Sequence, residues 1–295
     1  MPTQSLPHVH TPEYKREGLD INQLRPEDRA AHAWYRFVLS YPPHLVREYL
    51  QKFQIDSSQC VLDPFCGTGT TPVECKKLGI KSVGIEANAM PAFACKTKLN
   101  WTVNPDLLVQ HAEDIATASE AILAKPRRRK LSLNEEKHKL LLTNSISPVP
   151  LDKTLVLLEQ IKKRYDVHSN THIRLALAKA LVSSISNLRF GPEVGVGPAK
   201  LDAPVIESWL QAVKIMADDL QVLALKAETE AVVHHNDSRN IAQIIESSSV
   251  DAVITSPPYP NEKDYTRTTR LESVLLGFIH SKAELQALKR GLVRS

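Results

Sequence analysis

Cysteine is scarce in this chain of 295 residues, and long apolar runs are absent. The four cysteines form no C-x-x-C pair, so neither a zinc site nor a disulfide framework is expected. No apolar run approaches the roughly 18 residues that a membrane helix needs. The N-terminal stretch is polar and lacks the apolar core of a signal peptide. We therefore expect a cytoplasmic protein with reduced thiols and no resident metal.

Two common nucleotide-binding signatures are also missing. The dinucleotide fingerprint G-x-G-x-x-G, begun by Gly67 and Gly69, requires a third glycine at position 72, which is Pro72. No Gly-Lys-Ser/Thr follows this loop, so it is not a P-loop. These absences disfavour a dehydrogenase and a P-loop NTPase.

The composition is that of an ordinary globular protein. Apolar residues make up 42% of the chain and charged residues 24%, and 295 residues suffice for one large domain or two small ones. The net charge of +4 is compatible with an anionic partner but does not demand one.

Four apolar segments predict the strands of a parallel sheet. They are Val61-Leu62, Lys81–Glu86, 231–235 and 250–255. The first ends in a glycine turn, and a helix should run from there to Gly79, a typical C-terminal cap. Glu86 ends the second strand, where a carboxylate binds ribose hydroxyls in Rossmann sheets. The fold class is therefore α/β, a Rossmann-like doubly wound sheet.

The remaining segments predict helices. Helices are expected over 43–53 and 89–101, and near 153–165, 172–189, 204–228 and 270–280. Residues 107–111 are also compatible with a short strand. The predicted organisation is a polar N-terminal arm (1–30), a cofactor-binding half (31–103), a mostly helical insertion and candidate target-recognition region (104–230), and a catalytic-strand half (231–295).

A second loop, Thr255-Ser256-Pro257-Pro258-Tyr259, follows the fourth strand. Two consecutive prolines fix the backbone angle φ at both positions and so aim the Pro257 carbonyl rigidly. A serine, a fixed carbonyl and an aromatic ring at a strand end are typical of a binding site.

The two loops together resemble those of the S-adenosylmethionine-dependent DNA amino-methyltransferases. The resemblance implies S-adenosylmethionine as cofactor and DNA as partner, with a target base turned out of the duplex. Asp237 matches the family's adenine-binding acid; Asp114 competes for that role if 107–111 is a strand. Residues 36–42 loosely resemble the segment that closes over the methionine end. The cofactor-binding residues implied are Asp63, Pro64, Phe65, Cys66, Gly67, Thr68, Gly69, Thr70, Glu86 and Asp237.

The second loop then carries the catalytic residues. Ser256 and the Pro257 carbonyl are implied to accept the hydrogens of a base amino group, with Pro258 fixing the turn and Tyr259 stacking on the base. Cytosine-C5 methylation is disfavoured because the chain has no Pro-Cys pair. Serine rather than Asp at position 256 favours cytosine N4 over adenine N6. The expected enzyme is a site-specific DNA (cytosine-N4) methyltransferase of restriction–modification or epigenetic marking.

Alternatives remain. An RNA guanine-N2 methyltransferase also has two prolines and an aromatic residue in this motif, although it usually begins with Asp or Asn. The sheet of this fold normally has seven strands and only four are placed, so it looks incomplete at the C-terminus. A partner chain or a further segment is expected to complete it, and an inactive fragment that binds cofactor or partner is the third hypothesis. Residues 261–270 and the basic run 127–130 are weaker candidates for phosphate contacts.

Overall fold

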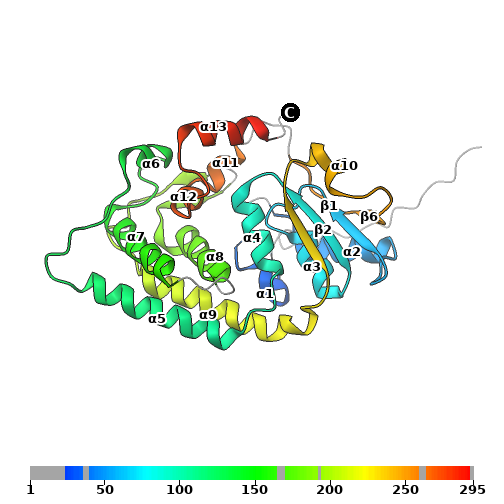
Figure 1. Cartoon of the computed structure of the whole chain (residues 1–295), viewed down its shortest axis with the longest axis horizontal. Helices are drawn as coiled ribbons and strands as arrows, with labels where there is room; N and C mark the ends of the chain where they lie inside the picture. The colour runs from blue at the N-terminus through cyan, green and yellow to red at the C-terminus, as the bar shows by residue number, and fades with distance from the viewer. Residues whose placement is uncertain (1–23, 36–39, 165–169, 192–193, 259–263, 293–295) are drawn as a thin grey trace, which may run out of the picture.

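The computed structural model describes residues 24–35, 40–164, 170–191, 194–258 and 264–292. Figure 1 shows a parallel sheet with its helices on one side of the molecule and a helical part on the other, with α4 (Ala89–Leu99) between them. The predicted α/β class is confirmed. The catalytic candidate Tyr259 lies outside the described residues.

The sheet contains four parallel strands, each at a predicted place. They are β1 (Cys60–Asp63), β2 (Lys81–Glu86), β5 (Ala231–His235) and β6 (Ala252–Val253). Their spatial order is β5-β2-β1-β6, so the chain moves outward from β1 and then crosses to its other side. Leu62 pairs with Val83 of β2 and with Val253 of β6. This crossing point is where doubly wound sheets bind ligands.

Local chemistry fixes the turns beside β1. Gly69 has φ +93° and precedes α3 (Thr70–Leu78), and a Cβ there would stand 2.4 Å from Cys95 Sγ. Only glycine satisfies both conditions. Gly79 ends α3 in the left-handed conformation, as predicted. Asn88 caps α4 by accepting a hydrogen bond from the Met90 N–H at 3.3 Å.

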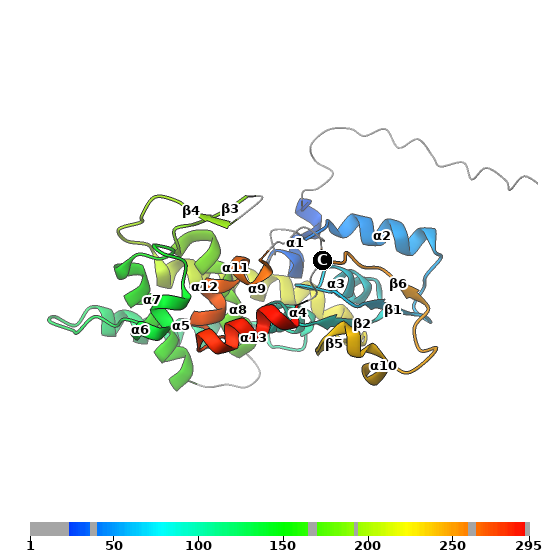
Figure 2. The same ribbon diagram turned by 90° about the horizontal axis from the view of Figure 1, so that it is seen from above.

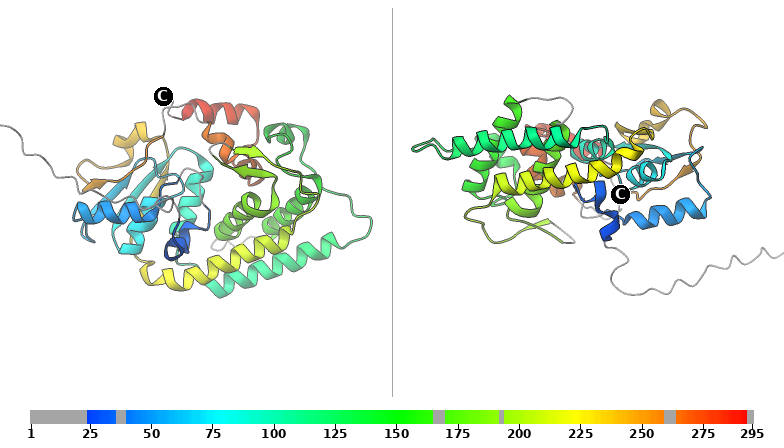
Figure 3. Two further views of the ribbon diagram at one scale, coloured as in Figure 1. Left: turned by 180° about the vertical axis from the view of Figure 1, so that it is seen from behind. Right: turned by 90° about the horizontal axis from the view of Figure 1, so that it is seen from below.

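The segment between β2 and β5 is dominated by helices. They are α5 (Pro105–Leu123), α6 (Glu135–Leu140), α7 (Pro148–Lys163), α8 (Asn170–Ala180) with its π-helical turn η3 (Leu181–Ile185), and α9 (Val205–Leu223) with the 3-10 turn η4 (Ala224–Lys226). The long helices α5 and α9 lie side by side (Figure 3). The strand alternative for 107–111 is wrong, because these residues lie in α5 behind Asn104, which accepts a hydrogen bond from Leu107 N–H.

A two-stranded hairpin replaces the expected helical end near residue 189. Its strands are β3 (Leu188–Phe190) and β4 (Val194–Val196), paired antiparallel. The buried side chain of Asn187 fixes the base of this hairpin. It donates a hydrogen bond to Asn144 O at 2.8 Å and accepts one from the Lys200 N–H at 2.8 Å. Figure 2 shows the hairpin on the outside of the helical part. An asparagine hydrogen-bonded over long range gives no periodic sequence signal, and the prediction missed it.

Short elements complete the chain. They are η2 (Pro26–Asp28), α1 (Arg29–His32), α2 (Pro43–Lys52), η5 (Ser238–Asn240), α10 (Ile241–Ile244), α11 (Tyr265–Thr268), α12 (Arg270–Leu275) and α13 (Lys282–Gly291). The helix expected over 270–280 ends at Leu275 because the chain turns at Gly277, whose φ is +81°. No helix among the described residues is long and apolar enough to cross a membrane.

One apolar core joins the sheet to the helical part. Met90 of α4 and the fully buried Trp209 of α9 belong to the same cluster of buried side chains. Trp209 Nε1 donates to Ile173 O of α8 at 2.9 Å. Tyr35 donates to Glu272 Oε1 of α12 at 2.6 Å, tying the segment before α2 to the C-terminal helices. Burial raises the pKa of Glu272 to about 7.

Buried charges tie α1 and α2 to α3. His32 Nε2 lies 2.7 Å from Glu74 Oε1, and Arg47 Nη1 lies 2.6 Å from Glu74 Oε2. Burial lowers the pKa of His32 to about 4, so the imidazole is neutral at pH 7 and donates to Glu74. Burial alone raises the pKa of Glu74, but its hydrogen bond with His32 and the neighbouring cations bring it to about 2.

The pKa of His32 predicts an acid sensitivity. A histidine whose pKa is depressed on folding stabilises the fold fully above its unfolded pKa near 6.5 and loses that contribution as the pH falls towards 4. We expect about 3 kcal/mol of unfolding free energy to be lost in this window. His32→Gln, which keeps a donor to Glu74 but does not titrate, should flatten the dependence in urea unfolding between pH 7 and 4. The exposed His138→Gln is the control, and equal slopes for His32→Gln and wild type would refute the assignment.

Candidate active site

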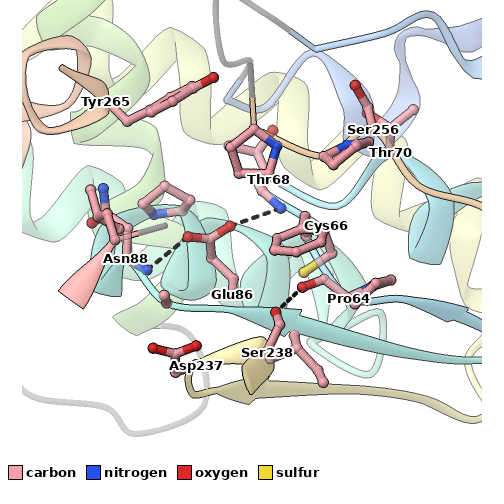
Figure 4. Close-up of a pocket in the computed structure, with 18 of the residues that line it drawn as sticks. Pro64, Cys66, Thr68, Thr70, Glu86, Asn88, Asp237, Ser238, Ser256 and Tyr265 are labelled. Carbon is pink, nitrogen blue, oxygen red and sulfur yellow. Dashed lines mark hydrogen bonds between the residues drawn. The ribbon is translucent and has the colours of Figure 1, made fainter. Parts of the chain in front are cut away.

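A cleft lies at the carboxyl ends of the four parallel strands. Both sequence loops line it: the glycine loop after β1 and the double-proline loop after β6. Figure 4 shows Ser256 and Thr70 at one end of this cleft, Glu86 at its centre and Asp237 at the other end. The two turns are therefore brought together in one pocket.

Glu86 is the best-defined polar group of the cleft. Its Oε2 accepts from the Gly67 N–H at 3.0 Å and its Oε1 accepts from the Asn88 N–H at 2.7 Å. Burial raises the pKa of this carboxyl group to about 7, although both N–H groups favour its charged form. The side chain is thus fixed from two sides, and it lines the cleft.

The glycine loop offers space and donors around Glu86. Gly67 has φ +52°, and a Cβ built there meets no atom within 4 Å, so the cleft comes directly down to the backbone. At the start of α3 no side chain caps the helix, and Thr70 of its first turn lines the cleft. Open N–H groups at a helix N-terminus suit an anionic or carboxylate group.

Asp237 lies beyond β5 at the far end of the cleft. Its carboxylate is paired with Arg239, whose Nε lies 2.9 Å from both carboxylate oxygens, and this hydrogen-bonded guanidinium lowers the pKa of Asp237. Arg239 also donates to Gly291 O of α13 at 2.9 Å. Its competitor Asp114 lies exposed on α5, outside the set of lining residues.

Asp63 has a different surrounding from the other glycine-loop residues. It is fully buried and is not among the residues that line the cleft, and nor is Gly69. Its Oδ1 accepts from Thr255 Oγ1 at 2.6 Å and from the Phe65 N–H at 3.1 Å, and its Oδ2 accepts from the Tyr41 hydroxyl at 3.0 Å. Asp63 therefore joins the β1 turn directly to the residue before Ser256.

The other predicted site residues lie in the cleft wall. Those that line it are Pro64, Phe65, Cys66, Gly67, Thr68, Thr70, Glu86, Asp237, Ser256, Pro257 and Pro258. Sequence reasoning missed several more, among them Asn88, Ser238, Tyr265 and Leu292. The helix-capping Asn88 carried a usable signal, since it follows the Glu86 strand directly. Tyr265 begins α11 and Leu292 follows the end of α13, and no local pattern encodes their approach to the cleft.

The Asp63–Thr255 hydrogen bond predicts that removing the Thr255 hydroxyl lowers the free energy of unfolding. Thr255→Val keeps the side-chain shape but removes the donor, leaving Asp63 Oδ1 with only the Phe65 N–H among the hydrogen bonds described. We expect a loss of about 1–3 kcal/mol in unfolding free energy, measured by urea denaturation. Thr117→Val on the exposed face of α5 is the matched control. A Thr255→Val protein as stable as this control would contradict the link.

Comparison with known proteins gives a consistent result. The family model described as DNA methylase, of the N6/N4 type, matches residues 6–90, which include the glycine loop and Glu86. The type II methyltransferase M.BsoBI of Geobacillus stearothermophilus is 28% identical over 287 residues, covering 87% of this chain and 54% of that relative. The type II methyltransferase M.AvaI of Nostoc sp. is 24% identical, covering 88% of this chain and 56% of that relative.

The chain thus spans about half the length of these curated relatives. A shorter match, 30% identical over 82 residues, links it to the type II methyltransferase M.MjaII of Methanocaldococcus jannaschii. No solved structure matches the chain. The resemblance drawn from the two loops is confirmed: the chain is similar to the DNA amino-methyltransferases, a family that uses S-adenosylmethionine as its methyl donor.

Proposed function

We propose that this chain carries the cofactor-binding and catalytic part of a site-specific DNA methyltransferase that methylates an exocyclic amino group, at cytosine N4. The observation that carries this proposal is the Asp63–Thr255 hydrogen bond of 2.6 Å, which sets the glycine loop and the double-proline loop on one cleft. Methyl transfer requires the methyl group of the donor and the acceptor nitrogen of the base to be held close together in one site.

The cleft fits S-adenosylmethionine in its chemistry. Glu86 offers a half-buried, fixed carboxylate for the two ribose hydroxyls, and the open space over Gly67 lets a ligand approach the backbone. The uncapped α3 N-terminus beside Thr70 suits the methionine carboxylate. Asp237, held by Arg239, would accept from the adenine amino group at the other end. When bound, this cofactor supplies an electrophilic methyl group.

The acceptor nitrogen must be activated, and in this proposal Ser256 and Pro257, which both line the cleft, activate it. A base amino group is a poor nucleophile because its lone pair is delocalised into the ring. Ser256 Oγ and the Pro257 carbonyl would accept its two hydrogens and hold the nitrogen out of conjugation with the ring. The fixed φ angles of Pro257 and Pro258 keep that carbonyl in place. The site thus works by orientation and electrostatics, without a covalent intermediate.

Two further observations support the choice of target base and of biological role. Serine at position 256, rather than Asp, favours cytosine N4. The relatives M.BsoBI and M.AvaI are type II methyltransferases, which supports a role in restriction–modification for this chain. Adenine N6 and guanine N2 of RNA are the competing acceptors.

The pKa of Glu86 predicts how cofactor affinity depends on pH. The carboxylate form accepts the ribose hydroxyls, and it replaces the neutral acid as the pH rises through about 7. We expect the Kd for S-adenosylmethionine, measured by calorimetry, to fall about tenfold between pH 6 and 8. Glu86→Gln should weaken binding by about tenfold or more at pH 8 and remove the pH dependence. Glu120→Gln on α5 is the control, and binding by Glu86→Gln that still follows pH would disprove the role.

Ser256→Ala tests the acceptor assignment. Methyl transfer from labelled cofactor to DNA should fall about 100-fold or more, because the chemical step loses one of two oriented acceptors, while the Kd for the cofactor stays within about twofold. Ser249→Ala, in an exposed turn, should behave as wild type. Sequencing that resolves N4-methylcytosine from N6-methyladenine identifies the base, and labelling of tRNA instead of DNA would replace the DNA proposal. Full activity of Ser256→Ala would remove Ser256 from the mechanism.

A further inference from the structure

The double-proline loop follows the shortest strand of the four-stranded sheet. β6 has only two residues, Ala252–Val253, and these pair with β1. A further bond to β1 runs from the Ile254 N–H to Leu62 O at 3.1 Å. So short a strand constrains the chain only weakly at Ser256, and the side-chain contacts of Ile254 and Thr255 therefore decide where Ser256 lies.

Thr71 supplies the contact at Ile254. This fully buried residue lies in the first turn of α3, next to Thr70, which lines the cleft at the same end as Ser256 (Figure 4). Its Oγ1 donates a hydrogen bond to Ile254 O at 3.1 Å. Ile254 is thus held from two sides, because β1 binds its N–H and α3 binds its carbonyl.

This bond differs from the usual bond of a buried threonine in a helix. Such a hydroxyl commonly donates to the carbonyl four residues earlier, as Thr154 of α7 does to Pro150 O at 2.8 Å. Thr71 instead donates to a residue 183 positions later in the sequence. Its hydroxyl therefore connects two separate segments of the molecule, whereas the Thr154 hydroxyl stays within its own helix.

The Tyr41 hydroxyl holds Thr71 in this orientation. It is hydrogen-bonded to Thr71 Oγ1 and also donates to Asp63 Oδ2 at 3.0 Å. Because the single hydroxyl hydrogen of Thr71 is directed to Ile254 O, Thr71 accepts in its contact with Tyr41. Tyr41 itself lines the cleft. The hydrogen bonds thus run from the cleft wall through α3 to the residues that precede Ser256.

We propose that Thr71 is a positioning residue for methyl transfer, whose hydrogen bond to Ile254 O sets the place of Ser256 relative to the glycine loop. This inference rests on the proposed function and adds a residue to it. Thr71 is not among the residues that line the cleft, so it acts through Ile254. Loss of its hydroxyl should displace Ser256 and slow methyl transfer, and the cofactor contacts at Glu86 should stay intact.

Three variants of the full chain test this role, on the DNA that the wild-type protein methylates and at saturating cofactor. Thr71→Val keeps the branched shape but removes the hydroxyl, so kcat should fall by about 10- to 100-fold while the Kd for S-adenosylmethionine stays within about twofold of wild type. Thr71→Ser keeps the hydroxyl, so its kcat should stay within about threefold of wild type. The equally buried Thr154→Val is the control and should keep the wild-type kcat.

Hydrogen exchange of the ligand-free protein gives a readout that does not depend on activity. In Thr71→Val, mass spectrometry should show amide exchange about tenfold faster or more over residues 250–256, while β2 exchanges as in wild type. A general loss of stability would speed exchange in both segments, so the comparison separates local positioning from folding. Tyr41→Phe removes the hydroxyl that holds Thr71 and should speed exchange over the same residues.

The outcomes separate this inference from the proposed function. A wild-type protein that methylates no DNA defeats both. If the wild type is active, a Thr71→Val enzyme with the kcat of Thr154→Val overturns the positioning role alone, and so does a Thr71→Ser enzyme as slow as Thr71→Val. A rise in the cofactor Kd that accounts for the lost activity also overturns it. Should Thr71→Val not fold, faster exchange over residues 250–256 in Tyr41→Phe supports the role, and unchanged exchange there overturns it.

Discussion

The cleft depends on one buried carboxylate, that of Asp63. An aspartate with no exposed surface is costly unless each oxygen is hydrogen-bonded. Here Thr255, Tyr41 and the Phe65 N–H satisfy it, and burial raises its pKa. The donors come from three segments far apart in the sequence, so satisfying this charge fixes where the segments meet. Asp63, one of the predicted cofactor-binding residues, therefore joins these three segments in the structure.

The carboxylates that line the cleft are each fixed by hydrogen bonds from other groups of the protein. Glu86 is held by two backbone N–H groups and Asp237 by Arg239. Preorganised charges need little rearrangement when a ligand arrives. Arg239 also donates to Gly291 O of α13, so the Asp237 end of the cleft and helix α13 share one guanidinium.

The sequence predicted the sheet well because strands, glycine turns and the Glu86 position follow local rules. The four strands were placed, and residues of both loops lie in the cleft. The prediction from sequence failed where contacts between residues far apart in the sequence determine the local structure. The β3–β4 hairpin depends on Asn187, which binds Asn144, Ser147 and Lys200. The approach of Tyr265 to the cleft likewise arises from tertiary packing, whereas the pairing of Asp237 with Arg239 is local, two residues apart, but is not encoded by apolar periodicity.

The placement of the helical part between β2 and β5 has a kinetic consequence. Gly84 of β2 pairs with Val233 of β5, although the whole helical segment lies between these two strands in the sequence. The two strands can pair only when the chain of this segment brings its ends together. Non-local pairing of this kind carries a large loop-closure entropy and slows folding. During synthesis β1 and β2 leave the ribosome long before their outer neighbours. We therefore expect the β2–β5 pairing, which brings Asp237 to the same cleft as Glu86, to form late in folding.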